Sequence, residues 1–260
     1  MRPSERTSFL RPRLLLVIGV VVLGALAVSA WLVVPSLSRG TASSVTGENI
    51  KQVLLDGSEL TTLLDQPLTT LSASATSDGP EAMEDTSSPG ECAGVIAVAP
   101  KSVYKSAGVR GYAQQTWTDA DPNRATSRQA PVMFVKQAAI ALPSAADARA
   151  LFARFAEQWQ RCDGQPVNTA SPESEPSAQQ SSTAMHITDV RVITDVLAAS
   201  VVVDSSPKAP DTRALGVQGN CIVEVLIAFD GAHGGDTADD PQTSSIRAVQ
   251  AMRDKIRRMG

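Results

Sequence analysis

An uncharged apolar segment near the N-terminus constrains this chain more than any other feature. Residues 14–34 are 21 consecutive residues without a charged side chain, and four arginines stand before them against one glutamate. A helix of that length spans roughly 31 Å, about the hydrocarbon thickness of a bilayer. Because arginine-rich flanks tend to stay in the cytoplasm, we expect residues 1–13 to be a cytoplasmic tail and the remainder to be exported.

Residues 14–35 are interpreted as a transmembrane anchor, and a cleaved signal segment is the alternative. The apolar run is longer than the usual signal-peptide core of about 7–15 residues. Val28-Ser29-Ala30 nevertheless resembles a small-residue cleavage site, and cleavage would make the protein secreted. No cysteine stands directly after the run, which argues against a lipoprotein. We therefore expect a single-pass protein of the cell membrane, with a cytoplasmic N-terminus and an extracytoplasmic domain.

The rest of the chain is divided into a linker at 36–46 and one exported domain at 47–260. Segments 71–90 and 168–182 are rich in Ser, Thr, Pro and acidic residues, and are predicted as flexible loops. About 190 residues remain, which is enough for one domain with a real core. The net charge is −4, and the best basic cluster lies at a helix end near the C-terminus, so nucleic-acid binding is not expected.

Two helices stand out in the exported part, and a shorter one is expected before them. Ser144 is positioned to cap a helix whose apolar stripe includes Trp159, and Asp240 and Pro241 open the last helix. Ser58 is the expected N-cap of the shorter helix. The last helix has one apolar face, which we expect to be buried against the rest of the domain.

Six segments read as strands, and most are joined by short, hairpin-like connections. Gly219-Asn220 is a favourable two-residue turn between the last two of them. The predicted strands are 111–118, 132–142, 185–193, 196–203, 213–217 and 221–229. The fold class is therefore α+β, with a twisted, mainly antiparallel sheet flanked by helices.

The three cysteines predict one disulfide in an oxidising compartment. In the strand 221–229, Cys221 shares a face with apolar residues only, which favours a free, buried thiol. Cys92 and Cys162 stand at the ends of elements, so we expect these two to be bonded. The alternative is that Cys221 is exposed and forms an intermolecular disulfide.

Residues that could carry catalysis or bind a metal are few. No Gly-x-Ser-x-Gly, phosphate-binding glycine loop or His-Glu-x-x-His motif occurs, and Asp119 and Asp121 are expected to form a turn. His186 lies on a predicted strand. The remaining candidates gather in one glycine-rich loop, which we interpret as solvated: Asp230, His233, Asp236, Asp239 and Asp240. We therefore expect no catalytic, cofactor or metal site, and no enzyme activity.

Among the large aromatic residues, one is expected in the core, and the positions of Tyr112 and Trp117 stay open. Trp159 falls on the apolar stripe of its helix and is expected in the core. Tyr112 and Trp117 have opposite parity on one strand, so we expect at most one of them to face the core. The other is expected to be an exposed or edge-packed aromatic, with a ligand-groove position as the alternative.

Several segments together resemble the extracellular sensor domain of the mycobacterial kinase PknH, a domain also found in stand-alone exported proteins of actinobacteria. The resemblance covers most of residues 50–260. It is carried by LLDGSELTTLLDQPLTT (54–70), PGECAGVIAVAPKSVYKSAGVRG (89–111), AAIALPSAADARALFARFAEQWQRCDG (138–164), TRALGVQGNCIVEVLIAF (212–229) and the final AMRDKIRRM. The most specific pieces are Glu-Cys-x-Gly-Val, a helix ending Trp159-x-x-Cys162, and Arg213-Ala-Leu before an Asn220-led strand.

This resemblance implies a twisted sheet flanked by helices and a cleft that binds an unidentified ligand, without implying catalysis. Members carry two disulfides, one of which matches Cys92 and Cys162. The other would fall near Asp211 and Ala228, so that bridge is missing here. Since only a short cytoplasmic tail is expected before the anchor, we expect no kinase domain in this chain. The residues that line the cleft cannot be transferred from the resemblance.

The leading hypothesis for function is a membrane-tethered, non-catalytic, ligand-binding or sensor-like domain of the cell envelope. Its expected partners are the membrane, through the N-terminal helix, an unidentified small-molecule or envelope ligand, and a membrane protein that transmits a signal. The alternatives are a protein–protein interaction or scaffold module and an unrecognised envelope hydrolase. A buried cluster of carboxylates, alone or with His186 or His233, would favour the hydrolase.

Overall fold

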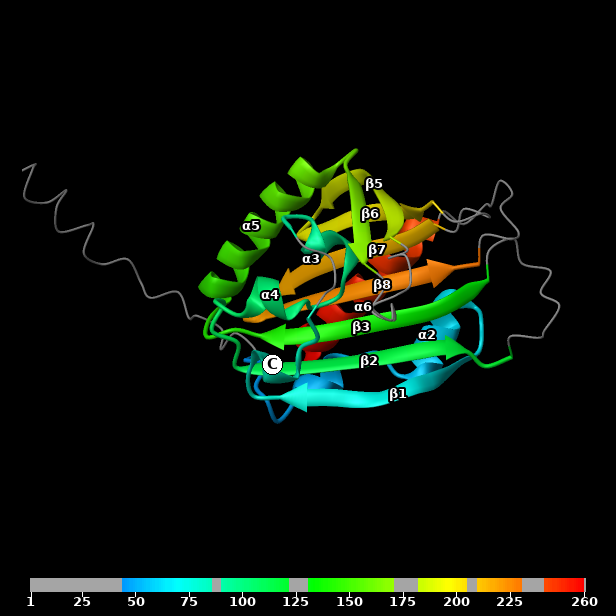
Figure 1. The fold of residues 1–260 in the computed structure, drawn as a ribbon. Coiled ribbons are helices and arrows are strands. Elements are labelled where there is room, and N and C mark those ends of the chain that lie inside the picture. The colour runs from blue at the N-terminus through cyan, green and yellow to red at the C-terminus, as the bar shows by residue number, and fades with distance from the viewer. Residues whose placement is uncertain are drawn as a thin grey trace, which may run out of the picture. The chain divides into compact units, whose positions relative to one another are not determined.

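The protein was analysed as a computed structural model, which describes residues 44–85, 90–121, 131–170, 182–204, 210–230 and 241–259 (Figure 1). Residues Ala42–Gly260 form one compact unit. No helix within the described ranges is long and apolar enough to cross a membrane. The predicted anchor or signal at 14–35 lies outside them.

One antiparallel sheet organises the domain, with its strands in the order β1-β2-β3-β8-β7-β6-β5-β4. The strands are β1 Leu68–Ser77, β2 Gly111–Asp119, β3 Val132–Ala141, β4 Pro166–Ala170, β5 Ser182–Ile193, β6 Val196–Val203, β7 Pro210–Gln218 and β8 Cys221–Phe229. The central strands β3 and β8 pair along nearly their whole lengths. The predicted α+β class with a large antiparallel sheet flanked by helices is thus confirmed.

Helices cover both faces of the sheet (Figure 1). The helical elements are η1 Ile50–Val53, α2 Gly57–Leu64, η2 Pro80–Ala82, α3 Ala93–Ile96, α4 Lys101–Tyr104, α5 Ala145–Cys162 and α6 Pro241–Arg258. One core lies between the sheet and the side of η1, α2 and α6, and the second lies on the side of α3, α4 and α5. Every residue of β8 is buried as a result.

The coverage of both faces corrects the prediction for the two aromatics of β2. Tyr112 is fully buried in the α5-side core, and Trp117 is 9 % exposed in the α6-side core. Side chains of opposite parity cannot lie on the same face of a strand, but each face of this sheet has its own core. Trp117 packs so closely beneath Gly57 that a Cβ there would lie 2.9 Å from the indole. Neither aromatic is an exposed groove residue.

The prediction of a flexible loop at 71–90 is also wrong in part. Its first residues belong to the edge strand β1, and η2 follows at Pro80–Ala82. β1 is almost entirely Ser, Thr and Ala and is exposed along most of its length, so it lacks the apolar alternation that marks a half-buried strand. The loop predicted at 168–182 is shorter than expected as well, because β4 extends to Ala170 and β5 begins at Ser182.

The helix α2 is capped two residues earlier than predicted. The N-cap is Asp56 and not Ser58, because the Asp56 carboxylate accepts bonds from the backbone N–H groups of Ser58 and Glu59. The Glu59 carboxylate accepts the Asp56 N–H in return, which completes a capping box. The Ser58 hydroxyl also donates to the Asp56 carboxylate. This bond, followed by those from the two backbone N–H groups, lowers the pKa of Asp56. Ser144 caps α5 as expected, since its hydroxyl accepts from the Asp147 N–H.

Candidate functional site

A groove between α2 and α6 is the best candidate for a binding site. It encloses about 470 Å³, within the range of small-ligand pockets. One wall comes from the start and outer face of α2, and the other from a single face of α6. The lining residues are Leu55, Ser58, Glu59, Thr62, Leu63, Arg247, Ala251, Asp254 and Arg258.

Buried polar side chains fix the α2 wall to the sheet. The Gln137 side chain clamps Leu55, because its Oε1 accepts from the Leu55 N–H at 2.9 Å and its Nε2 donates to the Leu55 carbonyl at 2.7 Å. Gln66, just after the helix, makes the same pair of bonds with the backbone of Val132. Both glutamines are almost fully buried. Both ends of α2 are therefore tied to β3, which preforms this wall.

Lys255 joins the two walls at the start of α2. Its Nζ donates to the Leu54 carbonyl and to a Glu59 carboxylate oxygen, each at 2.7 Å. Glu59 is thereby shared between the capping box and this ion pair. Because Lys255 is only 19 % exposed, the pair is better shielded from water than an ordinary surface ion pair.

The charges of the groove separate into paired and unpaired groups. Glu59 is paired with Lys255, and Asp254 is paired with Arg257. Arg247 and Arg258 are exposed, and no ion pair to either is found among the described residues. The apolar surface of the groove comes from the partly exposed side chains of Leu63 and Ala251. The groove therefore presents an apolar strip with a positive group toward each end.

The described lining of the groove contains no histidine, and both of its hydroxyls are engaged within α2 and its cap. The Ser58 hydroxyl donates to the Asp56 carboxylate, and the Thr62 hydroxyl donates to the Ser58 carbonyl. Across the described part of the chain, no group of three or more His, Cys, Asp or Glu side chains is close enough to hold a metal ion. The arrangement therefore supports recognition by shape, apolar contact and charge.

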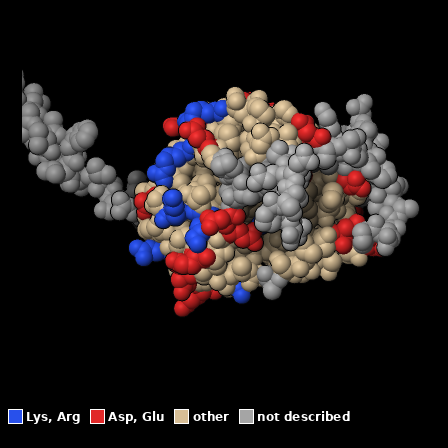
Figure 2. All heavy atoms as spheres, in the orientation of Figure 1, with Lys and Arg blue, Asp and Glu red and all other residues tan. Residues whose placement is uncertain are grey.

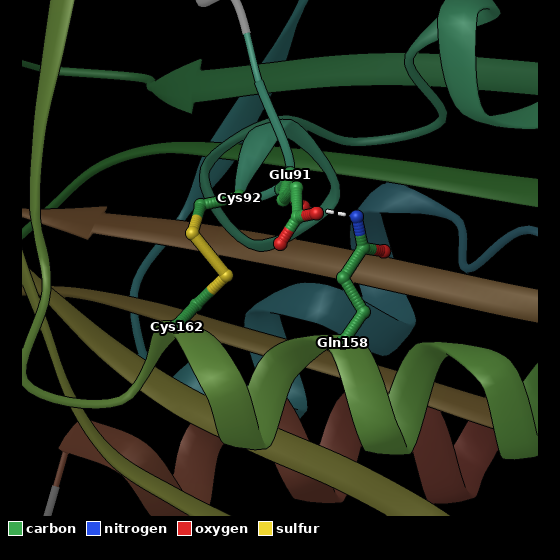
Figure 3. The surroundings of a disulfide bond; sticks show 4 residues. All are labelled: Glu91, Cys92, Gln158 and Cys162. Atoms are coloured by element: carbon green, nitrogen blue, oxygen red, sulfur yellow. Dashed lines mark hydrogen bonds between the residues drawn. A yellow bond between two sulfur atoms is a disulfide. The ribbon is translucent and has the colours of Figure 1, made fainter.

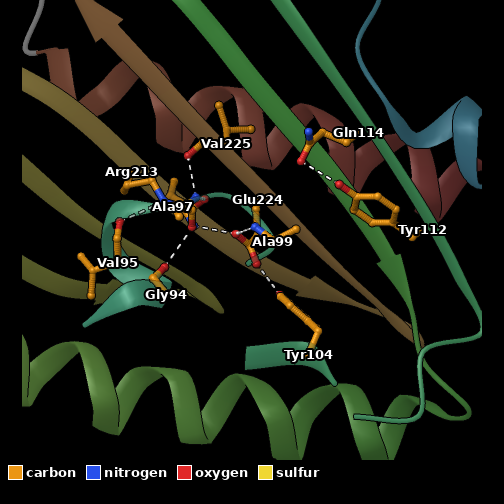
Figure 4. Close-up of polar contacts among 11 residues, drawn as sticks. Gly94, Val95, Ala97, Ala99, Tyr104, Tyr112, Gln114, Arg213, Glu224 and Val225 are labelled. Atoms are coloured by element: carbon orange, nitrogen blue, oxygen red, sulfur yellow. Dashed lines mark hydrogen bonds and ion pairs between the residues drawn. The ribbon is translucent and has the colours of Figure 1, made fainter. Parts of the chain in front are cut away.

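A second polar cluster lies in the α5-side core and was not predicted (Figure 4). Arg213 of β7 and Glu224 of β8 form an ion pair at 2.6 Å, and both are at most 1 % exposed. Glu224 also accepts from the Ala99 N–H and the Tyr104 hydroxyl. Burial and the Glu224 charge raise the pKa of Tyr104 far above its usual range, so the phenol stays protonated and donates.

Arg213 holds the short helix α3 to the sheet. Its guanidinium donates to the carbonyls of Gly94, Val95 and Ala97 at 2.7–3.1 Å, which caps the end of that helix. It also lies 5.4 Å from the centre of the Trp159 ring. Since every charged group in this cluster is satisfied and sealed from solvent, the buried carboxylate of Glu224 is structural and does not favour a hydrolase site.

The predicted disulfide is confirmed between Cys92 and Cys162 (Figure 3). Their Cα atoms are 5.8 Å apart. The bond joins the residue before α3 to the last residue of α5, and Gln158 adds a hydrogen bond to the Glu91 carbonyl. The third cysteine, Cys221, is free and fully buried, and burial raises the pKa of its thiol to about 12.

The remaining residues singled out from the sequence do not converge on one site. His186 contacts Asp204 at 3.1 Å, with both side chains more than 40 % exposed. Asp119 accepts from the Asp121 N–H, as expected of a turn. In the glycine-rich loop that was considered for metal binding, Asp230 is described and residues 231–240 lie outside the described ranges.

Asp211 and Ala228, the positions of the missing second bridge, are direct cross-strand neighbours in β7 and β8. Burial raises the pKa of Asp211 to about 7. Such cross-strand positions lie close together, as the two cysteines of a disulfide must. The predicted strand began at 213, whereas β7 also includes Asp211. A carboxyl group that titrates near neutrality thus occupies one of the two positions.

The visible face of the domain carries charges of both signs (Figure 2). Acidic and basic side chains form small neighbouring groups there, with uncharged surface between them. One ordered contact of this kind joins Lys136 to Glu84 at 2.6 Å. The helices α2 and α6, whose residues line the groove, lie on the opposite side of the sheet, behind the strands in this orientation (Figure 1).

Comparison with known proteins assigns the chain to a family. Residues 45–255 match the family described as the PknH-like extracellular domain, and the chain belongs to it. The crystal structure of the extracellular domain of PknH from Mycobacterium tuberculosis shares its fold, with a TM-score of 0.65 at 18 % identity. It matches over 83 % of this chain and 98 % of that one.

A second solved structure, of an uncharacterised protein from Mycobacterium smegmatis, has a TM-score of 0.30 at 11 % identity. The match covers 73 % of this chain and 86 % of that one. No curated protein matches the sequence significantly. The family therefore rests on the domain match, and the PknH structure supports the fold.

Proposed function

We propose that this protein is a non-catalytic, sensor-like binding domain of the cell envelope, tethered to the membrane by residues 14–35. The extracellular character of the family supports export, and the arginines before the apolar run support the orientation. The disulfide between Cys92 and Cys162 suits an oxidising compartment.

The observation that carries the proposal is the preformed α2–α6 groove with its two unpaired arginines. Its walls are held by the Gln137 clamp, the capping box and Lys255, so little ordering is needed when an occupant binds. An apolar strip between two exposed positive charges supports both affinity and orientation. The groove thus supports a binding role for the domain.

Native mass spectrometry of the full chain, purified from its own envelope, tests this function. Ala251→Trp fills the groove with an indole, and Ala153→Trp makes the same change on an exposed position of α5. We expect a bound species on the native chain and on Ala153→Trp, and its loss from Ala251→Trp. A native chain without any bound species, or equal occupancy of Ala251→Trp, would contradict the proposal.

A further inference from the structure

The two unpaired arginines of the groove are widely separated along one helix face. Arg247 and Arg258 point to the same side of α6, and at 1.5 Å per residue their Cα atoms lie about 16 Å apart. No described residue forms an ion pair with either guanidinium. Guanidinium groups whose Cα atoms are this far apart on one helix face fit an elongated occupant with a negative group near each end.

The charges between these ends are already neutralised within the domain. Glu59 is held by Lys255 at 2.7 Å, and Asp254 by Arg257. An occupant therefore meets no unpaired carboxylate along the middle of the groove. It meets the partly exposed apolar side chains of Leu63 and Ala251 instead, which favours an apolar central stripe.

The walls favour a helix over an extended peptide. Both walls are α-helices whose backbone groups are bonded within the helix, so an extended strand would find no main-chain partners there. A helix satisfies its own backbone bonds and needs only side-chain contacts. The small side chains of Ser58 and Ala251 leave room for another helix to approach closely.

We propose that the α2–α6 groove binds an acidic amphipathic helix of another envelope protein. One carboxylate of that helix pairs with Arg247 and a second, with the same spacing, pairs with Arg258. Its apolar stripe packs on Leu63 and Ala251. This inference rests on the proposed function, because it names the class of partner that the same groove takes. An anionic lipid carries its charge at one end, and so matches only half of the pattern.

Fluorescence anisotropy of a labelled peptide with the detergent-solubilised full chain tests the inference. The peptide is a helix of about 18 residues with an apolar stripe and two glutamates spaced as the arginines are. A matched peptide carries lysine at both places. We expect the glutamate peptide to bind at least about tenfold more tightly than the lysine peptide, since each exposed ion pair contributes a modest amount. The preference should weaken with salt.

The variant Arg247→Glu/Arg258→Glu should invert this preference, and Arg161→Glu on the exposed surface of α5 should leave it unchanged. Both groove arginines are exposed, so the double variant keeps the core contacts of α6. Equal binding of the two peptides, or a preference that the double variant does not invert, would overturn the inference.

Two further outcomes separate the inference from the proposed function. Vesicles with phosphatidylglycerol that bind the native chain but not the double variant, without peptide binding, would assign the groove to lipid. A small bound mass that disappears from Ala251→Trp would keep the binding function and likewise overturn the helical partner. If neither peptide binds and the native chain carries nothing from its envelope, the inference and the proposed function both fail.

Discussion

Replacing Arg213 by methionine should destabilise the domain strongly. The ion pair with Glu224 has a distance of 2.6 Å, and both side chains are at most 1 % exposed. Without the guanidinium, a buried carboxylate keeps only the Ala99 N–H and the Tyr104 hydroxyl. The carbonyls at the end of α3 also lose their donor. Breaking a buried pair in this way costs about 3–5 kcal/mol of the free energy of unfolding.

The two charges should also be coupled. Glu224→Gln alone leaves the Arg213 charge buried without its counter-charge, and we expect a loss of about 3 kcal/mol. In Arg213→Met/Glu224→Gln no unpaired charge remains, so the combined loss should fall below the sum of the single losses by about 1–3 kcal/mol. The α3 carbonyls still lack a donor in the double variant, which keeps it less stable than the native chain.

Urea unfolding of the full chain in mild detergent, followed by tryptophan fluorescence, measures these free energies. Trp159 lies against Arg213 and is therefore a suitable reporter. Arg161→Met on the exposed surface of α5 serves as the control and should change the stability by less than about 0.5 kcal/mol. A cost below about 1 kcal/mol for Arg213→Met, or additive losses in the double variant, would refute the electrostatic account.

Three further changes test other parts of the structure. Replacing Cys92 and Cys162 by alanine opens a loop of sequence separation 70, which should lower the free energy of unfolding by about 4 kcal/mol in the same urea assay. Burial raises the pKa of Asp211 from its ordinary value of 3.8 to about 7, so the free energy of unfolding should fall as pH rises from about 4 to 7 and level off above. The variant Asp211→Asn should be as stable as the native chain at pH about 4 and more stable at pH about 8, by up to about 4 kcal/mol. Equal stability at pH about 8 would contradict the burial of this carboxyl. Gly216→Ala places a Cβ 2.5 Å from Val249 and should cost about 1–3 kcal/mol, measured as a lower unfolding midpoint.

Elements with a strong local signal were predictable from the sequence. The α5 helix combines a cap at Ser144 with an apolar stripe that includes Trp159, and the structure has both features. The turn at Gly219 joins β7 and β8, with the glycine at φ 58°. The disulfide followed from the position of Cys92 at an element end and from the apolar neighbours of Cys221.

Features that depend on tertiary partners were missed. The face of β8 that carries Glu224 was not assigned to a core, because strand parity separates two faces without showing that both are covered. Arg213 belonged to a recognisable motif, Arg-Ala-Leu, but its role depends on the distant carbonyls of α3. The edge strand β1 has too few apolar residues to be distinguished from a loop.

The groove itself could not be found from the sequence alone. Leu55 and Leu63 come from the start of the domain's sequence, and Arg247 and Arg258 come from its end. The sequence showed the arginine at the C-terminal end of the last helix only as part of a basic cluster. The charge pattern becomes visible once α2 and α6 lie side by side on the same face of the sheet.

Hydrogen–deuterium exchange of the full chain, with and without the species that co-purifies from its envelope, tests the central claim most directly. Binding in the groove should slow exchange in α2 and α6 and leave α5 unchanged, because α5 lies on the other face of the sheet. The Ala251→Trp variant should show no such slowing. Protection confined to α5, or equal protection in Ala251→Trp, would contradict the assignment of the α2–α6 groove as the binding site.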